Sequence, residues 1–166
     1  MGIIVTGRVW KFGNEVSTDS IIPAFALALP WEERKKKMLL VHEKFNSSCR
    51  PGDVIVAGKN FGCGSAREEA PESLTRLGVG CVVAESFGRL FFRNCISTGF
   101  PVMACKGVSD IFSEGDTLEL NLEEARMRNI TTGKEIKGPT LPPDLLAILE
   151  SGGILEQLKA EKRQST

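Results

Sequence analysis

Residues 60–71 read NFGCGSAREEAP and directly follow the apolar stretch GDVIVAGK at 52–59. The short, β-branched run Asp53–Ala57, bounded by glycines, predicts a buried strand. Apolar residues at helical spacing over Arg67–Leu77 predict a helix after the glycine run. A strand, a glycine turn and a helix in this order are typical of a β-α-β unit, in which neighbouring strands run parallel.

The same alternation extends to both sides of this stretch. Further buried strands are expected at Ile3–Val9, Cys81–Ala84 and Val102–Cys105, and a second helix at Phe87–Ile96. The sequence therefore predicts an α/β fold with a mixed sheet and flanking helices.

The later part of the chain has a different pattern. Thr117–Leu122 alternates polar and apolar residues, and RMRNITTGKEI at 126–136 predicts a hairpin that turns at Thr132–Gly133. Pro142–Pro143 opens a closing helix, and Gly152–Gly153 separates it from a polar tail that we expect to be frayed over 160–166. We expect residues 1–166 to form a single domain with an added antiparallel portion.

Composition and charge exclude several classes of protein. Lys plus Arg equals Asp plus Glu at 21 each, so no net field favours nucleic acid or a membrane surface. No apolar run reaches the ~20 residues of a membrane span, and we expect no secretory leader. The five cysteines form no C-x-x-C pair, which indicates free thiols in a reducing, cytoplasmic compartment.

Metal and histidine chemistry are restricted as well. His42 is the only histidine, so a zinc motif cannot be assembled, and any Ser-His or Cys-His pair would have to use it. We therefore expect no metal site on this chain.

The glycine run itself fits none of the common nucleotide or nucleophile templates, because no lysine follows Gly64 and no glycine stands two residues after Ser65. Two interpretations remain. Ser65-x-x-Glu68 matches a capping box, in which Ser65 only caps the helix. Alternatively, Gly62 and Gly64 let a ligand approach the main chain, helix-start amides attract its carboxylate, and Arg67 clamps it.

The stretch closely resembles the glycine-serine-arginine-glutamate motif of the aconitase superfamily's swivelling domain. It is most similar to the separate small subunits of 3-isopropylmalate dehydratases. Three further stretches agree with that family in the same order: GRVWKFGNEVSTDSIIP, AESFGRLFFRN and ESGGILEQL. The resemblance covers nearly the whole chain and implies a swivelling β/β/α domain.

The resemblance also implies roles for individual residues. Ser65 matches the serine that, as an alkoxide, removes a proton next to a carboxylate, and Arg67 matches the arginine that binds a substrate carboxylate. Asp19 matches the aspartate at the edge of the active site. Many relatives have a second serine where this chain has Ala66, and Arg89, Arg93 and Asn94 fit the second motif, with structural hydrogen bonding or substrate contact as their role.

The function implied is that of a small subunit in a hydro-lyase that is active only with a large subunit carrying a [4Fe–4S] cluster. The expected reaction interconverts 2-isopropylmalate and 3-isopropylmalate by dehydration and rehydration, in leucine biosynthesis. The alternatives are the same chemistry on homoaconitate, methylmalate, dimethylmalate or maleate, or a non-catalytic anion-binding subunit. The isolated chain can also form a homo-oligomer.

The segment after STDSIIP bears on the choice of substrate. In relatives that act on tricarboxylates, an arginine in this region binds the extra carboxylate. This chain has the apolar run 24–29 and no cation before Arg34. We expect this run to contact an apolar substituent of the substrate, with Phe25, Leu27, Ala28 and Leu29 as the candidate residues. The alternative is that these residues belong to the core or to a subunit contact.

Overall fold

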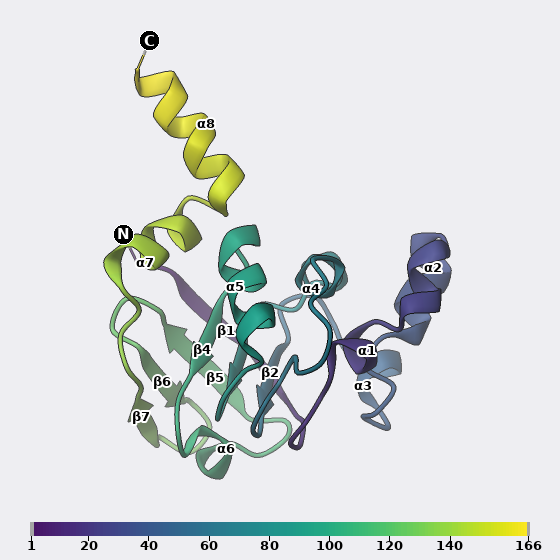
Figure 1. Ribbon diagram of the computed structural model, residues 1–166. Coiled ribbons are helices and arrows are strands. Elements are labelled where there is room, and N and C mark those ends of the chain that lie inside the picture. Colours follow the sequence, from purple (N-terminus) through teal and green to yellow (C-terminus); the bar gives the residue numbers. More distant parts are fainter. Residues whose placement is uncertain (1, 166) are drawn as a thin grey trace.

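A computed structural model describes residues 2–165 and contains a seven-stranded mixed sheet in the order β4-β3-β2-β1-β5-β6-β7 (Figure 1). Its strands are β1 (Ile4–Lys11), β2 (Val54–Ala57), β3 (Val82–Ala84), β4 (Val102–Ala104), β5 (Thr117–Asn121), β6 (Arg126–Asn129) and β7 (Glu135–Lys137). The predicted α/β class with a mixed sheet is confirmed.

The half of the sheet from β1 to β4 is parallel, as the alternation of strands and helices predicted. Val54 pairs with Val9, and Val82 pairs with both Ile55 and Val102. Every residue of β2 and β3 is buried. Strands covered on both faces are apolar throughout, which is why these segments show no alternation in the sequence.

The other half is antiparallel and joins the first half through β1, which pairs with β5 on its second edge. β5 alternates half-buried and buried residues, and the predicted hairpin forms between β6 and β7, where Met127 pairs with Ile136. One strand therefore carries both kinds of pairing.

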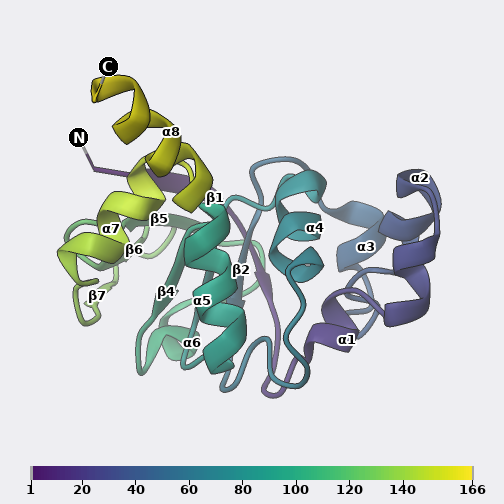
Figure 2. The same cartoon turned by 45° about the horizontal axis from the view of Figure 1, so that its top comes forward.

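The helices are α1 (Thr18–Ile21), η1 (Ala24–Ala28), α2 (Trp31–Arg34), η2 (Lys35–Lys37), α3 (Phe45–Ser48), α4 (Glu69–Leu77), α5 (Arg89–Thr98), α6 (Val108–Ile111), α7 (Pro143–Glu150) and α8 (Ile154–Gln164). The short helices from α1 to α3 lie together at one side of the sheet, and α4 and α5 lie side by side over one face (Figure 2). α7 and α8 pack against α5, and α8 then leads away from the sheet.

The polar tail over 160–166 is expected to be frayed, and α8 continues to Gln164, so the first five of these residues are helical in the structure. Glu156 at its first turn and Lys162 and Arg163 at its last turn complement the helix dipole, which stabilises a helix even where few apolar side chains are buried. Thr166 lies outside the described residues. None of the helices within residues 2–165 has the length and apolar character that a membrane crossing requires.

Candidate active site

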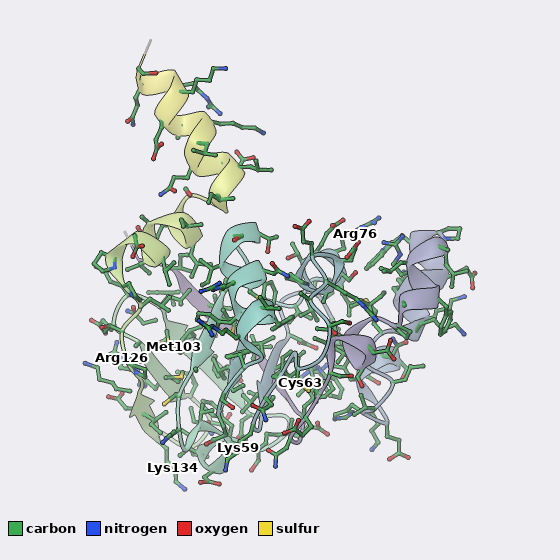
Figure 3. The ribbon with its side chains drawn as sticks, viewed as in Figure 1. Lys59, Cys63, Arg76, Met103, Arg126 and Lys134 are labelled. Carbon is green, nitrogen blue, oxygen red and sulfur yellow. The ribbon has the colours of Figure 1, made fainter. Side chains whose placement is uncertain are left out.

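The glycine run lies against the segment that leads into α1, and backbone hydrogen bonds hold the two together. The amide of Gly62 donates to the carbonyl of Val16 at 2.7 Å, and the amide of Thr18 donates to the carbonyl of Cys63 at 2.9 Å. The buried Thr18 hydroxyl donates to the carbonyl of Ser65 at 2.7 Å. Figure 3 labels Cys63 in this run. The loop that carries Ser65 is therefore fixed by a segment almost fifty residues earlier.

Arg67 and Asp19, which are far apart in the sequence, meet in the structure. Arg67 Nη1 donates to the carbonyl of Ile22 at 2.8 Å and to Asp19 Oδ1 at 3.3 Å. The Arg67 side chain is 18% exposed, whereas that of Asp19 is 68% exposed. Arg67 is thus held in one orientation, while most of the Asp19 carboxylate remains in contact with solvent.

The capping role considered for Ser65 is wrong. α4 begins at Glu69, four residues after Ser65, and no side chain caps it. An N-cap side chain reaches an amide only two or three residues further along, so Ser65 lies too early in the chain. The Ser65 residue is exposed, and within residues 2–165 its hydroxyl has no hydrogen-bond partner. This hydroxyl is available to a ligand.

Two helices begin close to the glycine run, and their first turns differ in charge. The first turn of α4 contains Glu69 and Glu72, whose charges disfavour an anion there. The start of α5 lies beside the glycine run instead, and its first turn has no acidic residue. The two elements line an open cleft of about 630 Å³, formed by Gly62, Cys63, Gly64, Gly88, Arg89, Leu90, Phe91 and Arg93.

Two glycines allow this close approach. Gly62 has φ +81°, and a β-carbon there would lie 2.2 Å from the ring of Phe91. A β-carbon on Gly88 would lie 2.5 Å from the carbonyl oxygen of Gly62. Only glycine fits at both positions, so backbone rather than side chain forms this wall of the cleft.

Cys63 is not an activated nucleophile. Burial raises the pKa of its thiol, and a hydrogen bond and the charge of Glu15 raise it further. A raised pKa keeps the thiol protonated and unreactive at neutral pH. His42 offers no base to this site, because its ring bonds Glu114 and the amides of Lys44 and Phe45.

No cluster of three or more histidine, cysteine or acidic side chains suited to a metal ion is found within the described residues 2–165. Cys81 and Cys95 are fully buried, and burial raises the pKa of Cys81 to about 12. Cys81 and Cys95 are therefore core residues.

The apolar run after α1 forms η1. Phe25 is 65% exposed and Ala28 is also exposed, whereas Leu27 and Leu29 pack in part against the core. Within residues 2–165, no hydrogen bond links these four residues to Ser65 or Arg67. Arg34 Nη2 donates to the carbonyls of Leu27 at 2.8 Å and Leu29 at 3.3 Å.

A swivelling domain of the aconitase superfamily is the class that this fold defines. Residues 19–105 match the family described as the aconitase C-terminal domain. The isopropylmalate/citramalate isomerase small subunit of Methanocaldococcus jannaschii is 47% identical over 167 residues, which cover 99% of each chain. The 3-isopropylmalate dehydratase small subunit 1 of Methanopyrus kandleri is 46% identical over 160 residues, covering 95% of this chain and 94% of that one.

A solved structure agrees with these relatives. The crystal structure of a 3-isopropylmalate dehydratase from Methanocaldococcus jannaschii superposes with a TM-score of 0.89, at 36% identity, over 98% of each chain. The chain therefore belongs to the family of 3-isopropylmalate dehydratase small subunits, which are components of hydro-lyases. The resemblance inferred from the four sequence stretches is confirmed.

Proposed function

We propose that this chain supplies one side of the active site of a hydro-lyase that interconverts 2-isopropylmalate and 3-isopropylmalate through the alkene. The observation that carries the proposal is the geometry at Ser65. Its hydroxyl is exposed and has no hydrogen-bond partner among residues 2–165, its carbonyl is fixed by Thr18, and Arg67 is held two residues further along. A serine with only a capping role would not need this arrangement.

Ser65 acts in this proposal as the base that removes the proton next to a carboxylate. A serine hydroxyl is a weak base, so its alkoxide must be stabilised by donors and positive charge close by. Arg67 binds the neighbouring carboxylate, because its guanidinium presents paired donors to two oxygens. Asp19 orients Arg67 through the 3.3 Å contact, and Gly64 leaves the backbone open to the substrate.

The partner in this proposal is a large subunit, in keeping with the relatives named as small subunits. We propose that the large subunit carries the [4Fe–4S] cluster, which would supply Lewis-acid chemistry for the departing hydroxyl. The five free thiols support a reducing, cytoplasmic location.

An alkyl-substituted malate is the substrate that η1 favours. The first cation after the apolar run, Arg34, donates through Nη2 to two backbone carbonyls of that run, which holds its side chain against the run. Burying an isopropyl group against apolar side chains would contribute roughly 2 kcal/mol, at about 0.8 kcal/mol per methylene. A carboxylate placed there would lose its hydration without a partner.

Citramalate, which is 2-methylmalate, is the second candidate substrate. The observation that favours it is the name of the 47% identical relative, an isopropylmalate/citramalate isomerase small subunit. The two substrates differ only in the alkyl group, and missing methyl groups alter rates modestly in an apolar pocket.

Reconstitution tests the proposal. The chain is purified with the large subunit from the same genome, the cluster is rebuilt without oxygen, and hydroxy diacids are screened for turnover. We expect alkylmalates to be turned over and homoaconitate to be rejected, and we expect the isolated chain to be inactive and free of iron and sulfide. Preference for homoaconitate, or stoichiometric iron on the isolated chain, would refute the proposal.

A further inference from the structure

Two arginines on one face of α5 line the cleft beside the glycine run. Arg89 and Arg93 are four residues apart, so their side chains lie on the same side of the helix. Both are exposed. Neither side chain makes a hydrogen bond or an ion pair to any residue in the described part of the chain, 2–165. The two arginines therefore do not stabilise the fold through such bonds.

Some cations on other helices of this chain form ion pairs with acidic residues one turn away. Lys35 bonds Glu32 at 2.8 Å, and Lys159 bonds Glu156 at 3.4 Å. α5 contains no acidic residue at all, since its sequence is RLFFRNCIST. Two adjacent positive charges without a compensating acid repel each other, and an anion in the cleft would relieve that repulsion.

The shape of the cleft favours a small anion over a protein segment. A volume of about 630 Å³ lies within the range of roughly 300–1,000 Å³ that is usual for small-molecule sites. One wall is the backbone of Gly62–Gly64, and Gly64 immediately precedes Ser65. An anion held by Arg89 and Arg93 would therefore lie beside the loop that carries the proposed base.

We propose that Arg89 and Arg93 bind the second carboxylate of the diacid substrate, the one that Arg67 does not bind. This assignment rests on the proposed function and deepens it. Arg67 is oriented by Ile22 and Asp19, and in the proposed function it binds one carboxylate of the substrate. A malate-type substrate has a second carboxylate. The arginine pair of α5 lines the same cleft as Gly64, and its donors have no partner within residues 2–165.

The test uses the complex with the large subunit and the variants Arg89→Gln and Arg93→Gln. Arg128→Gln is the matched control, because Arg128 is an exposed arginine on β6, at the antiparallel side of the sheet. The probe is 2-isopropylsuccinate, a diacid without a hydroxyl that cannot be dehydrated, and its two monoamides. Loss of one charge-assisted pair should raise the KM of the substrate and the Ki of the diacid by about 10- to 100-fold. One monoamide has an amide in place of the carboxylate that Arg89 and Arg93 bind, and its Ki should change little in these variants.

Three outcomes would overturn the assignment. The first is a Ki within twofold of wild type in both α5 variants. The second is an effect of equal size in Arg128→Gln. The third is a loss of activity that excess large subunit restores, since the arginines would then bind the partner instead of the substrate.

A second readout separates this assignment from the proposed function. In the isolated wild-type chain, titration with 2-isopropylsuccinate should shift the amide resonances of Gly62 and Gly64, and the shift should disappear in Arg93→Gln. If the resonances shift but the wild-type complex turns over no alkylmalate, the proposed function is refuted and the anion site is still supported. No shift in the wild type up to the solubility of the diacid would refute the site.

Discussion

The Thr18 hydroxyl donates a 2.7 Å hydrogen bond to the carbonyl oxygen of Ser65. Thr18 is only 1% exposed, and it is one of the few buried polar residues within 2–165. Because the same residue also donates its amide to the carbonyl of Cys63, it fixes the loop at two points. The position of the proposed base is therefore set by α1.

Replacing Thr18 by valine should reduce turnover at least tenfold. The shape of the side chain is kept, but the carbonyl of Ser65 loses its donor, which costs about 1–3 kcal/mol and loosens the loop. Thr18→Ser keeps the hydroxyl and is the control. Thermal unfolding and kcat of the reconstituted complex are the measurements, and equal kcat in the valine and wild-type complexes would show that the bond does not position Ser65.

Arg67→Lys should impair the complex almost as much as Arg67→Ala. Arg67 contacts Ile22 and Asp19 while it is proposed to bind substrate, and a lysine lacks the planar fork that allows several fixed donors at once. Steady-state kinetics on the three complexes gives the comparison. A lysine variant with unchanged kcat and KM would rule out the clamp.

Ala28→Arg should move kcat/KM toward a tricarboxylate. Ala28 is exposed on η1, so a longer side chain fits there, and it would add a cation that Arg34 does not provide. Ala28→Gln adds similar length without the charge and serves as the control. If both variants reject homoaconitate as strongly as wild type does, η1 does not face the substrate.

Asp53→Asn should lower the free energy of unfolding at neutral pH, and it should make that free energy less dependent on pH in acid. Burial alone would raise the pKa of Asp53, but hydrogen bonds from the Trp10 indole, the Arg50 amide and Arg8 hold it below the ordinary 3.8. A folded pKa below the unfolded one means that the contribution is present above pH 3.8 and is lost as the pH falls further. The free energy of unfolding of the variant should be about 1–3 kcal/mol lower than that of the wild type at neutral pH.

The measurement is chemical denaturation of both proteins across the acid range. The gap between them should narrow as the pH falls, because wild-type Asp53 becomes protonated. Glu85, Glu114 and Asp116 also have lowered pKa values, so some acid dependence should remain in the variant. A gap that is constant with pH would contradict the assignment to the Asp53 charge.

The strands, the hairpin and the parallel order could be predicted from the sequence, because apolar periodicity and glycine turns are local signals. The role of Thr18 could not, since its bond to Ser65 crosses 47 positions and Thr18 carries no local pattern of its own. The start of α4 was misplaced for a related reason. Ser65 and Glu68 have the spacing of a cap, but Thr18 of α1 holds the carbonyl of Ser65, and α4 begins only at Glu69.

The lining of the cleft could also not be predicted in full from the sequence. Arg89 and Arg93 fit a family motif, yet whether they are paired within the fold depends on neighbours that only the structure brings close. The apolar character of 24–29 was visible in the sequence. The hydrogen bonds that Arg34 donates to the carbonyls of that run were not.

Turnover of the complex containing Ser65→Ala tests whether Ser65 is the base of the reaction. Ser65 neither caps α4 nor makes a side-chain bond within residues 2–165, so the substitution should change stability by less than about 0.5 kcal/mol. Loss of a general base should lower kcat by roughly 10²- to 10⁴-fold. Ser47→Ala, at an exposed serine of α3, is the control and should keep full activity. A Ser65→Ala complex that assembles and turns over alkylmalate at the wild-type rate would show that Ser65 is not the base.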